Sequence, residues 1–241
     1  MKFKKILKHV VFLLLIGGLA FLYSFSLERN GNRKIVDSVV EFLPGVNNFL
    51  THEMVNKLLI QNGTTVKNQA KTVIDLYSLE NKVSKNPYVE KASVFLTIDG
   101  TLKSTIKQRT PVARIINDSS SYYIDKQGVE VPLSDVYSAR VMLISGVDDN
   151  EEIKEILPLV FFILDDDFLQ KEVVGIKKSD KGEFQLSVRS GDYKIDFGKL
   201  AEMDIKFKKL KAFYNKTFLD KTIQNYKKIN LKYHNQVVCT K

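Results

Sequence analysis

Cysteine and histidine are scarce in this sequence. Cys239 is the one cysteine, so no intramolecular disulfide can form and no cysteine-based zinc or iron–sulfur site can be assembled. Three histidines leave little material for a metal centre, and we expect no cofactor. Twelve glycines and five prolines exclude a collagen-like or low-complexity chain, while 44% hydrophobic and 27% charged residues are typical of a folded protein. The 241 residues allow one or two domains plus an appendage.

A convincing catalytic constellation is also lacking. Asp165-Asp166-Asp167 is the most obvious carboxylate cluster, but adjacent residues in a helix or turn diverge, so we expect a solvated helix end there rather than a cation site. Cys239 and His234 could form a nucleophile–base pair, yet positions five apart on one strand point to opposite faces. No glycine-rich phosphate loop is found in the sequence. We therefore predict that the protein is not an enzyme.

Positive charge is not gathered in one block. The formal net charge of +9 divides into +6 in residues 1–34, +2 in 35–120, −7 in 121–198 and +8 in 199–241. Lysines interleaved with aromatic residues near the C terminus could bind single-stranded nucleic acid, but an exported domain meets no chromosome. We predict no nucleic-acid partner and a solvated helix face. Docking of an acidic protein or of anionic headgroups is the alternative for these lysines.

The N terminus carries a candidate membrane anchor. Residues 1–9 are cationic, and the 18 residues Val10–Leu27 contain no charge. As a helix they would reach roughly 27 Å, close to the thickness of a hydrocarbon core. The lysines orient this end toward the cytoplasm, so we expect a cytoplasmic tail, a transmembrane helix at 10–27, a linker at 28–34 and an exported remainder. A cleaved signal peptide is the alternative, since Ser24-Phe25-Ser26 has small residues at a plausible cleavage spacing.

Residues 35–117 predict a small α+β domain. Ile35–Glu41 has the pattern of a strand, and Thr51 suits the N-cap of a first helix. Apolar residues at helical spacing predict a second helix from Val73 to Val83. Two strands joined by a turn at Asp99-Gly100 follow. The expected order β-α-α-β-β would place two helices on one face of a three-stranded sheet.

Residues 118–241 predict a mixed β domain with a few helices. A hairpin is expected at 122–132, and a helix at 151–164 that Pro158 should kink or break. A second helix carries an apolar stripe from Leu200 to Tyr214. The remaining strands are expected at 141–144, 173–176, 184–188 and 194–197.

The chain closes on a predicted strand, Ile229–Cys239. Its alternate residues are apolar and polar, which is typical of a strand with one face on a core and one in water. Because it ends the chain, we expect it near a sheet edge, where main-chain N–H and C=O groups lack partners. Such an edge could accept a strand from another protein.

Several motifs, in their order, resemble those of a known family. Asn86–Ala92 entering a strand and Gln108–Ala113 at the end of the domain resemble a POTRA domain. A POTRA domain directly after one N-terminal span is the layout of the FtsQ/DivIB family of bacterial cell-division proteins. The resemblance covers about residues 6–241, and the closing residues are similar to the Bacteroidota branch. The later motifs that carry it are Tyr122–Asp125, Pro132-Leu133, Ser145-Gly146, Phe197–Lys199, Phe207–Tyr214, Ile229–Tyr233 and Asn235–Lys241.

The resemblance implies a non-enzymatic scaffold of the division machinery in the cell inner membrane, concentrated at the septum. In the family, the C-terminal strand of the β domain pairs with a segment of FtsB, which is bound to FtsL. Where the motifs of this sequence match those of the family, the resemblance implies that Tyr233 and Lys199 are the first candidates for contact with the partner. Lys199 is expected at the start of a helix. Asn235, Lys232 and Leu231 are further candidates. Other division proteins could bind the POTRA domain.

Two other function classes remain open. POTRA modules also occur in envelope transport and outer-membrane assembly systems, but such a protein would need several POTRA repeats or a barrel. A cell-wall enzyme with a membrane anchor would need a nucleophile or acid pair that the sequence does not offer.

Overall fold

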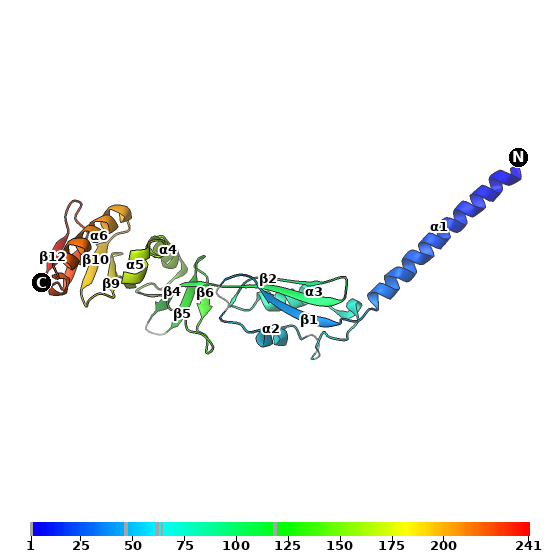
Figure 1. Cartoon of the computed structure of the whole chain (residues 1–241), viewed down its shortest axis with the longest axis horizontal. Helices are drawn as coiled ribbons and strands as arrows, with labels where there is room; N and C mark the ends of the chain where they lie inside the picture. Colours follow the sequence, from blue (N-terminus) through cyan, green and yellow to red (C-terminus); the bar gives the residue numbers. More distant parts are fainter. Residues whose placement is uncertain (1, 46–47, 61–62, 64, 118–119) are drawn as a thin grey trace. The chain divides into compact units, whose positions relative to one another are not determined.

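The computed structural model describes residues 2–45, 48–60, 63, 65–117 and 120–241 (Figure 1). The chain forms two compact units, Met1–Gln108 and Arg109–Lys241. The boundary is expected from the sequence between residues 117 and 118, and residue 118 lies outside the described residues. The strand before it, β4 (Pro111–Ile116), pairs within the sheet of the second unit, which moves the boundary to Gln108.

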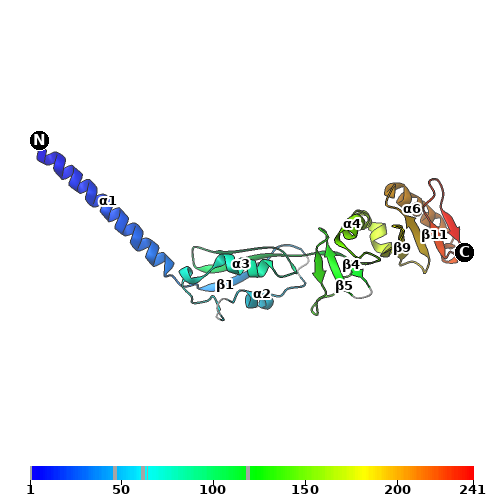
Figure 2. The ribbon, with the colours of Figure 1, turned by 180° about the vertical axis from the view of Figure 1, so that it is seen from behind.

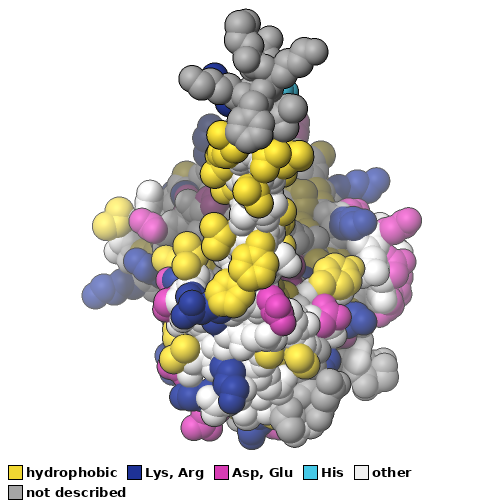
Figure 3. All heavy atoms as spheres, turned by 90° about the vertical axis from the view of Figure 1, so that its right-hand side faces the viewer, with side chains coloured by type: hydrophobic (Ala, Val, Ile, Leu, Met, Phe, Trp, Pro, Cys, Tyr) yellow, Lys and Arg dark blue, Asp and Glu magenta, His cyan; other side chains and the backbone are white. Residues whose placement is uncertain are grey.

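Helix α1 spans Lys2–Gly31, so it continues four residues beyond the expected span and takes up the first part of the expected linker. From Leu7 to Gly31 it is long and apolar enough to cross a membrane, and it is the one such helix in the described part of the chain. None of that segment is buried by protein, and hydrophobic side chains cover its surface (Figure 3). An unburied apolar helix of this length suits a lipid environment.

The rest of the first unit has the order β-α-α-β-β that the sequence predicts. Its sheet has the order β1-β3-β2, with β1 parallel and β2 antiparallel to the central strand β3. Buried aliphatic side chains from the helices and from one face of the sheet form its core. The elements are β1 (Asp37–Phe42), α2 (His52–Leu58), the 3-10 turn η1 (Lys71–Val73), α3 (Leu76–Ser84), β2 (Val89–Leu96) and β3 (Thr101–Gln108).

Side-chain caps set where the two short helices begin. Thr51 caps α2, as expected, because its hydroxyl accepts a hydrogen bond from Met54 N at 3.3 Å. Asp75 caps α3 by accepting from Ser78 N at 3.0 Å, so this helix begins at Leu76. The expectation that it begins at Val73 was wrong. Val73 belongs to η1 and is 57% exposed.

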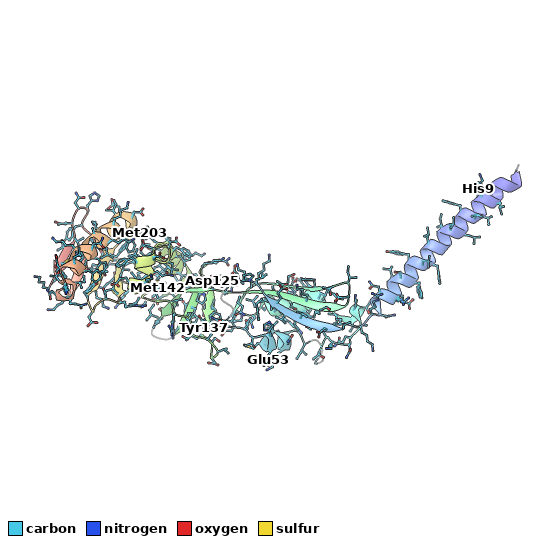
Figure 4. All side chains as sticks on the ribbon, viewed as in Figure 1. His9, Glu53, Asp125, Tyr137, Met142 and Met203 are labelled. Carbon is cyan, nitrogen blue, oxygen red and sulfur yellow. The ribbon has the colours of Figure 1, made fainter. Side chains whose placement is uncertain are left out.

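The second unit is built on a nine-stranded mixed sheet of order β12-β11-β10-β9-β8-β7-β4-β5-β6. Its core gathers side chains from the helices and alternate residues of the strands. Helix α6 begins at Met203 (Figure 4), and β11 lies beside the C terminus (Figure 2). The elements after β4 are β5 (Ser121–Asp125), β6 (Glu130–Pro132), β7 (Met142–Ser145), α4 (Asn150–Leu164), α5 (Asp167–Glu172), β8 (Val173–Lys178), β9 (Phe184–Val188), β10 (Lys194–Gly198), α6 (Met203–Leu219), the 3-10 turn η2 (Ile223–Asn225), β11 (Lys228–Asn230) and β12 (Val238–Thr240).

Helix α4 runs through Pro158 without the expected break. A proline removes one hydrogen bond to the carbonyl four residues earlier, here that of Lys154. Both Pro158 and Lys154 are exposed, so water can hydrate that carbonyl. The buried residues of α4 lie on its other side and hold it against the sheet.

Candidate functional site

The C-terminal edge of the nine-stranded sheet is the candidate site. Strand β12 ends the strand order and pairs antiparallel with β11, which in turn pairs parallel with β10. The terminal residues therefore lie at a sheet edge, as the sequence predicts. At the opposite edge, the short strand β6 contains Pro132, a residue that discourages further pairing.

The main chain of β11 shows which of its residues face β10. Leu231 N donates to Asp196 O at 2.9 Å, and Lys227 O accepts from Lys194 N at 3.1 Å. In a parallel ladder, alternate residues direct both their N–H and their C=O to the same neighbour. Ile229, halfway between these two positions, therefore faces β10. The residues on either side of Ile229 direct their main-chain groups to β12.

The same alternation fixes the main chain of β12. Cys239 lies opposite Ile229 in the register. Because the residues flanking Ile229 bond to β12, the residues flanking Cys239 bond to β11. Thr240 O accepts from Lys227 N at 2.8 Å, so the carbonyl of Thr240 faces β11. Lys227 itself, just before β11, departs from the alternation, because its C=O faces β10 and its N–H faces β12. The N–H and C=O of Cys239 thus point away from the sheet, toward the position that an added strand would occupy.

The two faces of β12 differ in chemistry. The Cys239 side chain is half-buried and packs against the core, and this burial raises the pKa of its thiol. Val238 and Thr240 lie on the opposite face, where both are exposed. An added strand would therefore meet an apolar strip on the core side and a polar surface on the other side.

Charged side chains cover the polar face of the sheet next to this edge. Lys228 Nζ lies 2.6 Å from an Asp196 oxygen, and Gln185 donates to the other oxygen at 3.0 Å. Burial raises the pKa of Asp196, but the hydrogen bonds from Lys228 and Gln185 outweigh it and hold the pKa below its usual value. Lys232 pairs with Glu183 at 3.0 Å, and this hydrogen bond raises the pKa of Lys232.

These groups line a cleft of about 300 Å³ on the polar face of β8 to β11. Lys228 and Lys232 enter it from the edge side, and Glu183 and Asp196 balance their charges. The surface beside β12 is therefore an ordered set of ion pairs rather than a bare cationic patch. Exposed ion pairs of this kind contribute little to stability, but they can direct which partner binds.

The predicted terminal strand is in fact two strands with a loop between them. The Asn230 side chain accepts from Lys232 N at 2.9 Å and closes a local turn after β11. Lys209 on α6 donates to Leu231 O at 3.2 Å and also to Tyr233 O, so these carbonyls are not available to a ladder. Placing Tyr233 and Asn235 on a strand was therefore wrong. Both lie in the loop between β11 and β12.

The five candidate contacts differ in accessibility. Tyr233 is 50% exposed, and Lys199, Lys232 and Asn235 are exposed as well. Leu231 is fully buried in the core, so its side chain cannot touch a partner in this fold.

Lys199 lies in the loop between β10 and α6 rather than at the start of the helix, because α6 begins at Met203. The Lys199 carbonyl accepts from Lys206 Nζ at 2.5 Å. His234 Nδ1 lies 3.3 Å from a Glu202 oxygen, which joins this loop to the loop between β11 and β12. The structure thus brings Lys199 and Tyr233 into neighbouring loops beside the sheet edge.

Sequence reasoning missed the groups that organise this edge. The main chain of Cys239, the loop anchor Lys209 and the acids Asp196 and Glu183 were not singled out. Asn230 was the available signal, because asparagine favours turns that end a strand. Asp166, expected to belong to a solvated helix end, caps α5 and pairs with Lys211.

Two family models match the chain. Residues 110–240 match a model described as FtsQ/DivIB, C-terminal related, and residues 44–107 match a POTRA-like domain. The first match alone spans more than half of the chain. The chain belongs to the FtsQ/DivIB family. A comparison with curated proteins finds no match.

Membership of the FtsQ/DivIB family supports a role as a cell-division scaffold, and the family is one of non-enzymatic scaffolds. The apolar helix α1 and the family together indicate a single-pass membrane protein. The two matched regions also agree with the α+β fold expected from the sequence: an N-terminal helix, a POTRA-like domain and a mixed sheet domain.

Proposed function

We propose that this protein holds division proteins together at the septum by capturing an FtsB-type protein, with FtsL bound to it, through strand addition along β12. The outward main chain of Cys239 carries this proposal. In strand addition, backbone hydrogen bonds supply affinity and alternate side chains supply selectivity. Strand β12 has only three residues, so side chains from the neighbouring loops must supply much of the binding energy.

The chemistry of the edge defines the partner strand. The segment 199–241 has a net charge of +8, and Lys199 and Lys232 lie in the two loops beside the edge, where an acid of the partner would compete with Glu183 for Lys232. An acidic segment with apolar residues at alternate positions would place its acids near these lysines. Its apolar residues would face the strip around Cys239. Tyr233 and Asn235 would contact the end of the added strand.

Replacing Tyr233 with glutamate is expected to weaken capture of the FtsB-type protein by about tenfold or more. The substitution removes an exposed aromatic contact and places a negative charge where an acidic strand should dock. The fold should persist, because Lys209 binds the Tyr233 main chain rather than its side chain. Co-purification of the full-length chain with tagged FtsB measures the effect.

Val136→Glu is the control, since Val136 is an exposed apolar residue in the loop after β6, the strand at the opposite edge of the same sheet. It should leave recovery of FtsB unchanged. Equal recovery with a folded Tyr233→Glu variant would remove Tyr233 from the contact surface.

The proposal also places the protein in the inner membrane, with its N terminus in the cytoplasm, both units in the periplasm and a concentration at midcell. The lysines in the first turns of α1 and the family membership support this orientation. A fluorescent fusion should form rings at midcell. A uniform signal around the envelope would contradict the scaffold and favour the alternative of an envelope transport component, which the POTRA-like domain keeps open.

A further inference from the structure

The segment that leaves α1 is bound to the first folded unit within a few residues. Ile35 N donates to Gln69 O at 2.8 Å, and Val36 N donates to Gly100 O at 3.0 Å. Val36 lies five positions after Gly31, where α1 ends, and these five steps span at most about 18 Å. The loop around Gln69 and the turn at Gly100 therefore lie close to the end of the apolar helix.

Large apolar side chains are exposed at this end of the unit. Ile98, in the turn between β2 and β3, is 91% exposed, Val36 is 61% exposed and Val73 is 57% exposed. Ile98 lies two residues before Gly100, and Val73 ends the η1 turn that follows Gln69. Ile98 and Val73 thus belong to the same two loops that are bonded to the segment after α1.

Tyr77, 75% exposed in the first turn of α3, lies at the same end. The Glu80 carboxylate accepts from Val94 N at 2.8 Å, which fixes α3 alongside β2. Helix and strand run in opposite directions because only a short turn joins them. The first turn of α3 therefore lies beside the Leu96 end of β2, the end from which the turn with Ile98 leaves. We call Val36, Val73, Tyr77 and Ile98 the apolar base.

Cations surround the apolar base. Four basic residues lie near the base in the sequence or in the loops that form it: Arg29, Arg33, Lys34 and Lys71. None of their side chains forms an ion pair in the described part of the chain. The nearby acids are engaged in local contacts. Asp37 pairs with Lys67 at 3.3 Å, and Asp99 accepts from the Thr101 hydroxyl at 3.0 Å.

We propose that the apolar base inserts into the headgroup region of the same membrane that α1 spans, with the four unpaired cations contacting anionic phospholipid headgroups. This inference rests on the proposed anchoring by α1. Aromatic and aliphatic side chains flanked by basic residues bind membrane interfaces in this way. The short tether adds a high effective concentration, so even weak intrinsic binding keeps the base on the lipid surface. Docking there limits how the POTRA-like domain can turn about the end of α1.

Nitroxide labels on the full-length chain test this docking. The chain carries Cys239→Ser and is reconstituted into nanodiscs of phosphatidylethanolamine and phosphatidylglycerol. A label at Ile98→Cys is compared with labels at Leu15→Cys within α1 and at Lys85→Cys beyond the far end of α3. All three positions are exposed, so the labels should not disturb packing. Relaxation by oxygen and by a water-soluble nickel chelate reports immersion in lipid.

We expect lipid immersion at Leu15, water exposure at Lys85 and, at Ile98, an oxygen-to-nickel ratio several-fold above that at Lys85. If the label at Ile98 were as accessible to the nickel chelate as the label at Lys85 while the label at Leu15 stayed immersed in lipid, the docking would be overturned and the anchor would stand. A water-exposed Leu15 label would overturn the anchor itself and the docking with it. Lys71→Glu should shift Ile98 toward water, and an unchanged Ile98 profile would overturn the role of anionic headgroups.

Discussion

Replacing Cys239 with proline is expected to weaken capture of an FtsB-type partner by at least about tenfold while the second unit stays folded. The outward N–H of Cys239 is the main-chain donor at the centre of β12, and proline has none. Loss of one hydrogen bond costs about 0.5–1.5 kcal/mol, and the proline ring adds a steric obstacle on the docking side. Together these exceed the roughly 1.4 kcal/mol that corresponds to tenfold in affinity.

The fold should tolerate this substitution because the lost N–H makes no bond to β11. Proline is accepted in edge strands where its nitrogen faces solvent. Cys239→Ala is the matched control: it removes the thiol, keeps the main-chain donor and should retain most of the affinity. Binding is measured with the full-length chain, and amide exchange in β11 confirms that the edge remains folded. Unchanged affinity in a folded Cys239→Pro variant would exclude strand addition at this edge.

A larger deletion would be less informative. The sequence alone predicts that removing residues 229–241 abolishes division. Ile229 and Leu231 are both fully buried in the core of the second unit, so their loss would damage the fold as well as the edge. The point substitution separates the two effects better, because the main-chain donor that it removes faces outward and the loss of the half-buried thiol is matched by Cys239→Ala.

The sequence predicted elements better than it predicted their limits. Period-two patterns located the strands, because one face of each strand is buried while the other is less so. The same pattern from Ile229 to Cys239 suggested one strand, because apolar and polar residues go on alternating through the residues that form the loop. The break comes from the Asn230 turn and from Lys209, which lies far away in sequence and takes two carbonyls of the loop.

The domain boundary illustrates a second limit. The motif Gln108–Ala113 resembles the end of a POTRA domain, but β4 begins inside it at Pro111. The sequence predicts no strand at 111–116, and a strand pattern there would not show which sheet the strand joins. Its partners, β5 and β7, lie later in the chain, so pairing decides the boundary. Candidate contacts had the same weakness: Leu231 matched a motif, yet the fold buries it.

Replacing Gln108 with alanine is expected to destabilise the first unit by about 3–5 kcal/mol. The Gln108 side chain is 2% exposed and ties the loop before α2 to the end of β3. Its oxygen accepts from Phe49 N and from Leu50 N, both at 3.0 Å, and its nitrogen donates to Leu50 O at 2.9 Å. Alanine would remove these three buried hydrogen bonds, and a loss of about 1–1.5 kcal/mol for each, near the lower end of the range for a buried group that loses a partner, gives the expected total.

Hydrogen exchange of the full-length chain, followed by mass spectrometry, measures this loss. Peptides of the first unit should exchange about a hundredfold faster or more, since each 1.4 kcal/mol is roughly tenfold in the opening equilibrium. Peptides of the second unit serve as an internal reference and should not change. Gln69→Ala is the matched control, because the Gln69 amide donates an exposed hydrogen bond to Thr65 O at 2.9 Å. If both variants exchanged equally slowly, the three bonds of Gln108 would not be what holds this loop.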